Sequence, residues 1–306
     1  MSPYLTLALG VLSAGLGGEL FVRGTVSLAT WARIAPGIVG ATVAAFATSS
    51  PELSVSITSA LAGTPQIALG DALGSNVVNI ALILAMALLI SGIQSSRDSI
   101  RRDFPVAFLV PVLSAALAAD GELSRLDGSL MLSVFLAWMI ATVIEARRQR
   151  SAAEEVLGAH RLAPALLSAA IGLGLLVGAG LLIVDGARAI AISFGLSEFI
   201  IGATVVAVGT SVPELATALI SKLRGHDEVG LGTVLGSNIF NGLFIVAVAA
   251  LIHPIAFEAS SVRVALAFGL VAVMLTLPGK SGYIGRGRGL LLLLLYVAYV
   301  VAVVRG

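Results

Sequence analysis

The chain has 306 residues, of which 58% are hydrophobic and 11% are charged, and its mean hydropathy is +1.05. Soluble domains carry about 25% charged residues, so this composition excludes a soluble globular protein. The sequence has no cysteine, which excludes disulfides and thiolate metal sites, and its net charge of +1 argues against nucleic-acid binding. We therefore predict an all-α membrane protein.

Ten apolar stretches follow one another along the chain, each close to the roughly 20 residues that a helix needs to cross a bilayer. They cover residues 3–28, 36–60, 66–92, 103–119, 128–146, 162–187, 198–221, 229–252, 260–277 and 288–304. The first stretch is too long and too poor in basic residues to be a cleaved signal peptide. The pattern predicts ten transmembrane helices, with both termini on the same side of the membrane.

Basic residues gather on one side of this predicted topology. If the N-terminus lies outside the cytoplasm, fourteen of the eighteen Lys and Arg residues fall in or beside the inner connections. Only Arg125, Arg188, Arg263 and Arg305 fall on the outer side. Because cytoplasmic loops carry the excess of Lys and Arg, we predict a multi-pass protein of the inner (cytoplasmic) membrane with both termini outside the cytoplasm.

The sequence also contains an internal duplication at an offset of 162 residues. Residues 40–79 align without a gap on residues 202–241, with 20 identities in 40 positions. The offset spans five predicted helices, so the second copy enters the membrane from the opposite side. We predict two inverted five-helix repeats, 1–146 and 162–306, joined by a cytoplasmic linker at 147–161. Inverted repeats with a site at their interface are a transporter architecture.

Each repeat places one glutamate, Glu52 or Glu214, near the middle of an apolar span. An ionised side chain at that depth costs at least about 3 kcal/mol unless it is paired. No Lys or Arg occurs in the membrane-buried part of either repeat. Two carboxylates carry a charge of −2, which one divalent cation would cancel. The alternative is that each glutamate is a neutral, hydrogen-bonded contact between helices.

Further oxygen donors surround each glutamate in the sequence. Pro51 and Pro213 each remove one helical hydrogen bond. This leaves carbonyls available near Ala45, Ala47 and Thr48 in the first repeat and near Ala207, Gly209 and Thr210 in the second. The motifs at 74–79 and 236–241 each place a serine and an asparagine four residues apart, on one helix face. Such hard oxygens suit Ca²⁺ and Na⁺, whereas transition metals prefer imidazole or thiolate.

The duplicated Thr-Ser-x-Pro-Glu and Gly-Ser-Asn motifs resemble the α-repeats of the cation/Ca²⁺ exchanger superfamily, in its Na⁺/Ca²⁺ exchanger branch. The resemblance implies that Glu52 and Glu214 are central ligands and that the backbone carbonyls of Thr48 and Thr210 bind Ca²⁺. It also implies flanking Na⁺ sites and a central pair of amides, formed by Ser49, Ser75, Ser211, Ser237, the carbonyls of Ala45 and Ala207, Asn79 and Asn241. Asn241 stands where several prokaryotic relatives and the K⁺-dependent branch carry Asp, which weakens any case for K⁺ co-transport.

The charge argument and the resemblance together predict a monomeric secondary antiporter, not an enzyme, that exchanges Ca²⁺ for Na⁺ by alternating access. A bound cation cancels the buried charge, so the loaded centre can cross a dry barrier and the empty centre cannot. The resemblance suggests that the Gly-rich first and sixth helices slide as a pair across the rest. The transported ions and the lipid bilayer are the expected partners, with no cofactor, nucleotide or nucleic acid.

Other functions fit the sequence less well. A Ca²⁺/H⁺ antiporter of the same fold is the nearest alternative, because a carboxylate removed from water binds a proton more readily. A passive cation channel would not need two inverted halves. A serine hydrolase would need a His or Lys base within reach, and neither repeat supplies one in the membrane. Outside the motifs, we expect Asp71 to cap a helix and Glu19 to pair with Arg23.

Overall fold

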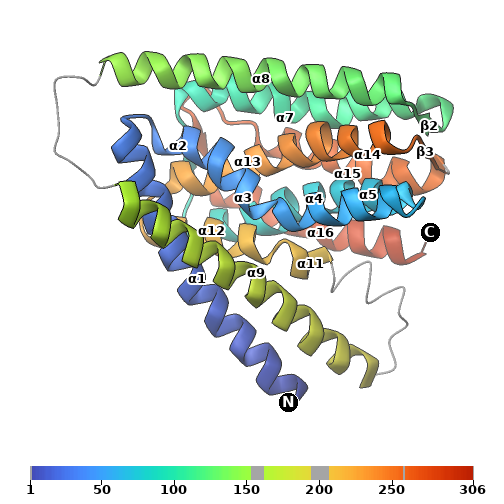
Figure 1. Ribbon diagram of the computed structural model, residues 1–306, viewed down its shortest axis with the longest axis horizontal. Coiled ribbons are helices and arrows are strands. Elements are labelled where there is room, and N and C mark those ends of the chain that lie inside the picture. The colour runs from blue at the N-terminus through green and yellow to red at the C-terminus, as the bar shows by residue number, and fades with distance from the viewer. Residues whose placement is uncertain (1, 153–161, 194–206, 258, 306) are drawn as a thin grey trace.

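The computed structural model describes residues 2–152, 162–193, 207–257 and 259–305, and nearly all of these are helical (Figure 1). The helices of the first half are α1 (Pro3–Ala32), α2 (Pro36–Val39), α3 (Ala45–Thr48), α4 (Ser50–Leu61), α5 (Pro65–Val77), α6 (Ala85–Ile90), α7 (Arg97–Leu117) and α8 (Arg125–Ala152). Those of the second half are α9 (Leu162–Ser193), α11 (Ala207–Thr210), α12 (Val212–Leu223), α13 (Asp227–Ile239), α14 (Val246–Ile252), α15 (Ala259–Thr276) and α16 (Arg286–Arg305).

Short segments of other geometry connect these helices. The π-helical segments Gly40–Ala44, Val78–Leu84 and Phe240–Ile245 join α2 to α3, α5 to α6 and α13 to α14, and a 3₁₀ turn, Ala118–Asp120, follows α7. Four two-residue strands, β1 (Ile93–Gln94), β2 (Glu122–Leu123), β3 (Ile255–Ala256) and β4 (Tyr283–Ile284), form two small antiparallel ribbons, β1 with β4 and β2 with β3.

By length and hydropathy, seven described helices can cross a membrane, so the protein is a multi-pass membrane protein. They are Pro3–Ala32, Pro65–Ile90, Arg97–Asp120, Arg125–Gln149, Leu162–Ile183, Asp227–Ile252 and Arg286–Val303. An eighth candidate is the pair Pro36–Thr48 and Ser50–Leu61, bent by 47°. Of the remaining predicted spans, 260–277 contains a shorter apolar helix, and 198–221 lies partly outside the described residues.

Two helix boundaries differ from what the sequence suggested. Helix α8 continues through Ala152, so the first six residues of the predicted linker are helical. The expectation that Asp71 caps a helix was wrong, because α5 begins at Pro65 and Asp71 lies in its second turn. Proline is favoured in the first turn of a helix, where the missing N–H costs nothing, and this signal outweighs that of the aspartate.

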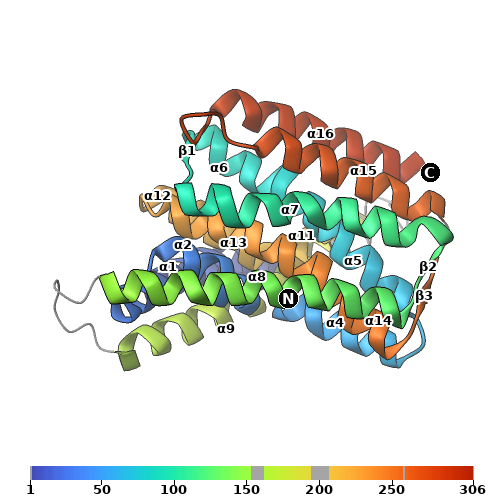
Figure 2. The same ribbon diagram turned by 90° about the horizontal axis from the view of Figure 1, so that it is seen from above.

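Helices α5–α6 and α13–α14 form the centre of the molecule, and the other helices surround them (Figure 2). In the most apolar 18-residue window of these two spans, 72% and 78% of the residues are buried, against 39% or less in the other single-helix spans. Helices α1 and α9 pack along one another and extend obliquely away from the rest (Figure 1). The central helices therefore hold whatever lies at mid-membrane, and the α1–α9 pair has its own long interface.

Contacts recur in reciprocal pairs at the offset of 162 residues. Helices α4 and α12 begin and end 162 positions apart, as do α5 and α13. A Cβ atom on Gly24 would lie 2.5 Å from the backbone nitrogen of Ala169, and one on Gly186 would lie 2.8 Å from that of Leu7. Since 24 and 186, like 7 and 169, differ by 162, the α1–α9 interface repeats the same close contact twice.

Candidate cation-binding site

The helix that carries Glu52 is interrupted immediately before it. Helix α3 ends at Thr48, Ser49 adopts φ −87° and ψ 11°, and α4 starts at Ser50. Pro51 has no N–H to donate to the carbonyl of Ala47, which instead accepts a hydrogen bond of 2.8 Å from the Ser50 hydroxyl. The interruption places Glu52 in the first turn of a new helix, inside the bundle.

The second copy has the same local geometry. Ser211 adopts φ −85° and ψ 12° between α11 and α12, and Pro213 and Glu214 occupy the first turn of α12. Leu215 N–H donates to the Ser211 carbonyl at 2.9 Å, as Leu53 N–H donates to the Ser49 carbonyl at 3.1 Å. The duplicated sequence thus produces the same backbone break in both halves.

Both glutamates are buried, with 1% of Glu52 and none of Glu214 exposed. Glu214 Oε1 accepts hydrogen bonds from the hydroxyls of Ser49 at 3.1 Å and Ser237 at 3.3 Å. Glu52 lies within the Coulomb field of Glu214, so the two halves bring their carboxylates to one place. Among the described residues, neither carboxylate has a Lys, Arg or His partner.

A group of buried oxygens around the glutamates has no hydrogen-bond partner within the described part of the chain. Native proteins leave few buried polar atoms unpaired, and each costs about 1–3 kcal/mol, so such a concentration in one place indicates a ligand. The atoms are Glu52 Oε2, Glu214 Oε2, Ser75 Oγ, Ser211 Oγ, Asn79 Oδ1 and Asn241 Oδ1.

Hydrogen bonds between the two halves hold the amides at this point. Asn76 Nδ2 donates to the Asn238 carbonyl at 3.2 Å, and Asn238 Nδ2 donates to the Asn76 carbonyl at 3.0 Å. Asn79 Nδ2 donates to Asn238 Oδ1 at 3.1 Å, which leaves Asn79 Oδ1 without a partner. Asn79 and Asn241 lie in π-helical segments, a geometry that is frequent at functional sites.

The threonines and alanines of the candidate site behave less uniformly. The Thr48 hydroxyl donates to the Ala44 carbonyl at 3.0 Å, and the Ala45 carbonyl accepts from Ser49 N–H at 3.0 Å. The Ala45 carbonyl is therefore already hydrogen-bonded, although its second lone pair can bind a cation. Thr210 and Ala207 form the ends of the short helix α11, beside the Ser211 break.

The donor set fits a hard cation. Among the described residues, no three His, Asp or Glu side chains come together as a metal cluster. The oxygens gathered here come from two carboxylates and from hydroxyls and amides, which Ca²⁺ accepts in coordination numbers of about 6–8. Transition metals would favour imidazole or thiolate. Asn76 and Asn238, which the sequence marked as duplicated without assigning them a role, prove to be the bridge between the halves.

The α1–α9 pair packs directly on the broken helices. Phe21 of α1 and Leu176 of α9 form a buried cluster with Ala44 and with Ala216 of α12. A Cβ atom on Gly180 of α9 would lie 3.0 Å from the Gly209 carbonyl. Any displacement of this helix pair would therefore be felt at the backbone next to the glutamates.

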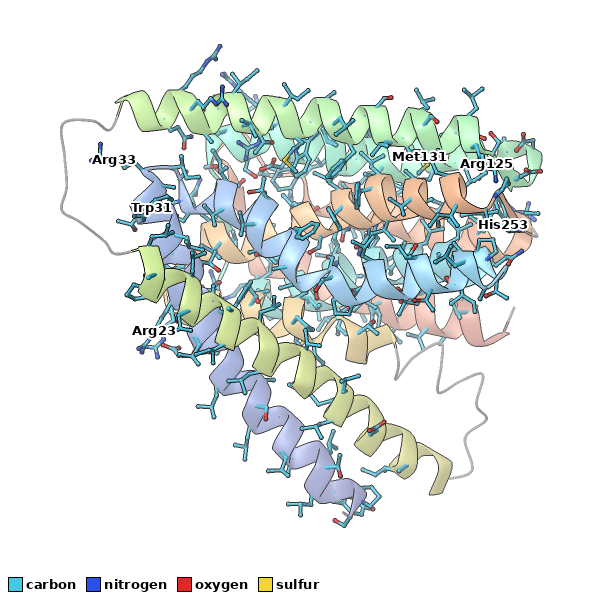
Figure 3. The ribbon with its side chains drawn as sticks, viewed as in Figure 1. Arg23, Trp31, Arg33, Arg125, Met131 and His253 are labelled. Atoms are coloured by element: carbon cyan, nitrogen blue, oxygen red, sulfur yellow. The ribbon has the colours of Figure 1, made fainter. Side chains whose placement is uncertain are left out.

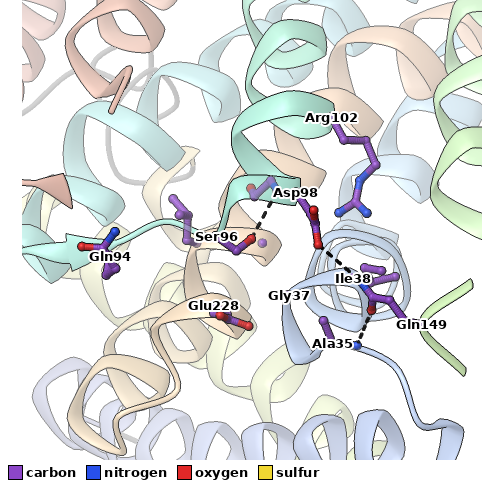
Figure 4. Close-up of a pocket in the computed structure, with 12 residues that line it drawn as sticks. Ala35, Gly37, Ile38, Gln94, Ser96, Asp98, Arg102, Gln149 and Glu228 are labelled. Atoms are coloured by element: carbon purple, nitrogen blue, oxygen red, sulfur yellow. Dashed lines mark hydrogen bonds between the residues drawn. The ribbon is translucent and has the colours of Figure 1, made fainter. Parts of the chain in front are cut away.

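A cavity of about 170 Å³ lies elsewhere, where α2, α7 and α13 begin (Figure 4). Gln149 of α8 bridges it: its Oε1 accepts from Ala35 N–H at 2.9 Å, and its Nε2 donates to Asp98 Oδ2 at 3.3 Å. Glu228 and Arg102 also line this cavity, but neither Glu52 nor Glu214 does. The cavity is thus a feature of one end of the bundle, separate from the candidate site.

Comparison with known sequences agrees with this chemistry. The family model described as sodium/calcium exchanger protein matches residues 2–144 and 164–305. The chain belongs to the sodium/calcium exchanger family. This confirms the resemblance carried by the motifs, and the two matched ranges correspond closely to the two predicted repeats.

Individual relatives of this family member cover most of its length. The chain is 36% identical over 295 residues to the protein CaxA of Alkalimonas amylolytica, with 92% of each covered. It is 35% identical over 257 residues to the inner membrane protein YrbG of Escherichia coli, with 81% of this chain and 79% of that protein covered. A solved structure of the sodium-calcium exchanger NCX_Mj, soaked with Na⁺ and Sr²⁺, superposes with a TM-score of 0.84 at 30% identity, covering 98% and 97% of the two chains.

Proposed function

We propose that this family member is a secondary antiporter that exchanges Ca²⁺ for Na⁺ across the inner membrane. The observation that carries the proposal is the meeting of two buried carboxylates, without basic partners among the described residues, inside a group of unpartnered oxygens. The family and the likeness to NCX_Mj support it.

The charge of the site explains why transport would be an exchange. An empty site carries −2 in a region of low dielectric constant, and moving that charge past a closed barrier is costly. One Ca²⁺ neutralises the carboxylates, and so do two Na⁺. Loaded sites can therefore change the side to which they open, whereas the empty site is held in place.

The proposed ligands divide by position. Glu52, Glu214 and the carbonyls of Thr48 and Thr210 bind Ca²⁺. Flanking Na⁺ ions use the serine hydroxyls and the carbonyls of Ala45 and Ala207, and the two amides close the centre. The serines and amides are Ser49, Ser75, Ser211, Ser237, Asn79 and Asn241. With amides at both positions 79 and 241, we propose no K⁺ co-transport.

The proposed architecture is ten transmembrane helices in two inverted repeats, 1–146 and 162–306, with 147–161 as cytoplasmic linker, working as a monomer. The matched bounds of α4 with α12 and α5 with α13, and the exchange of strands between β1–β4 and β2–β3, support it. Arg33 and Trp31 lie at one end of the bundle and Arg125 and His253 at the other (Figure 3). These ends would be the cytoplasmic and outer faces respectively, with both termini outside.

The α1–α9 pair would move relative to the remaining helices. Its internal interface depends on close glycine contacts, and it touches the broken helices through the cluster around Phe21 and Leu176. A rigid pair lying across the site can uncover the glutamates first from one side and then from the other, which is the motion that alternating access needs.

The test is ⁴⁵Ca²⁺ uptake into proteoliposomes with Na⁺ and pH gradients imposed separately. We expect uptake driven by an outward Na⁺ gradient and little response to a pH gradient alone. Uptake driven only by the pH gradient would identify the Ca²⁺/H⁺ antiporter, which shares this fold and these carboxylates. Uptake that needs neither gradient would identify a channel. The spare serine hydroxyls, which a proton carrier would not need, favour Na⁺.

A further inference from the structure

Asp71 is a third acidic residue near the glutamates, and the duplication gives it no acidic counterpart. It lies four residues before Ser75 on α5, so the two side chains share one helix face. The residue 162 positions later is Thr233, whose hydroxyl is fully buried and donates to the Val229 carbonyl at 2.9 Å. The two halves therefore differ in charge at this one position beside the proposed site.

The Asp71 carboxylate is only partly buried and lies within the Coulomb field of Glu52. Among the residues that the structure describes, no hydrogen bond or ion pair satisfies it, unlike the buried Asp103, which pairs with Arg102 and accepts from the Trp138 indole. An unpaired acid within a membrane span is costly and is typical of an ion pathway.

Asp71 lies between one end of the bundle and the site. Helix α5 starts at Pro65, and the next residue, Gln66, donates to the Ala256 carbonyl of β3 at 2.9 Å. At about 1.5 Å per residue, Asp71 is about 9 Å from this end and Ser75 about 6 Å deeper. Thr233 has the equivalent place in α13, whose first turns pack near β1, at the opposite end from β3 (Figure 2).

We propose that Asp71 is a specificity-determining residue on one face only, which attracts divalent cations and passes them to Glu52 and Ser75. The inference rests on the proposed function. Field lines from a carboxylate in a low-dielectric pathway raise the local concentration of cations. The face reached through Asp71, which is the outer face in the proposed orientation, then binds Ca²⁺ more tightly than the face reached past Thr233.

The test measures the Ca²⁺ concentration for half-maximal exchange on each face, in inside-out and right-side-out vesicles. We expect Asp71→Thr and Asp71→Asn to raise this concentration about tenfold on the Asp71 face and to leave the other face unchanged. Asp71→Glu retains the charge and should behave as wild type. Thr233→Asp should strengthen Ca²⁺ binding on the opposite face, and the double variant D71T/T233D should reverse the sidedness.

The failures of the two proposals are distinguishable. Wild-type vesicles without Na⁺-driven Ca²⁺ exchange would overturn the proposed function together with this inference. Wild-type exchange combined with an Asp71→Asn effect that is absent, or equal on both faces, would overturn the inference alone. Thermal melting of each variant in detergent shows that it is folded, and Asp71→Asn, with the shape of the original side chain, decides the matter if Thr233→Asp does not fold.

Discussion

The substitution Glu214→Gln removes one charge from the candidate site and leaves its shape in place. Glu214 is fully buried, and its Oε1 accepts from two serine hydroxyls, which an amide oxygen can also accept. At an effective dielectric constant of about 20, two unit charges about 4 Å apart interact by about 4 kcal/mol. Losing the carboxylate therefore weakens Na⁺ binding by about 4 kcal/mol and Ca²⁺ binding, with twice the charge, by about 8 kcal/mol.

The difference of about 4 kcal/mol predicts a loss of Ca²⁺ over Na⁺ selectivity of about 1,000-fold, since each 1.4 kcal/mol is tenfold. Titration calorimetry of the purified protein with Ca²⁺, repeated with Na⁺ present, measures this ratio, and ⁴⁵Ca²⁺ flux should fall to background. Glu228→Gln, the same change at an exposed position outside the site, is the matched control and should retain wild-type values. A folded Glu214→Gln protein whose selectivity stays within tenfold of wild type would refute the electrostatic reasoning. Glu52→Gln should also abolish the flux.

Three changes test the packing. Gly24→Ala places a methyl group 2.5 Å from a backbone nitrogen of α9 and should destabilise the protein by about 1–3 kcal/mol, whereas Gly15→Ala, with open space around it, should not; detergent melting curves compare them. Asn238→Ala removes two side-chain hydrogen bonds and Asn76→Ala one, so Asn238→Ala should lower the melting temperature more, and equal shifts would argue against the bridge. Lys222→Met breaks bonds to the Gly92 carbonyl and to a carboxylate that start from a side chain 4% exposed, and chemical unfolding should show a loss of about 1–3 kcal/mol.

Much of the fold was predictable because its signals are local or periodic. The excess of apolar residues requires a membrane, and an offset of 162 residues with polar identities requires duplicated elements. Proline directly before Glu52 and Glu214 marks both breaks, since proline cannot donate the bond that continues the helix. The family itself was recognisable from the same motifs, and the family match confirms it.

Other features depend on contacts between distant segments and could not be predicted in this way. The amide bridge joins Asn76 to Asn238, 162 residues away, and only the meeting of α5 with α13 reveals it. The carbonyl that Pro51 releases is Ala47, and the neighbouring Ser50 hydroxyl occupies it, a local competition that the motif does not display. The role of Asp71 was misjudged because its distance from Pro65, not its residue type, decides whether it can cap the helix.

The most direct test of the central claim is the position of Ca²⁺ in crystals of the protein, located by anomalous scattering. We predict one principal Ca²⁺ peak about 2.3–2.6 Å from carboxylate oxygens of both Glu52 and Glu214. A peak that contacts one glutamate while the other lies out of reach, or separate Ca²⁺ peaks at the two carboxylates, would contradict the shared site.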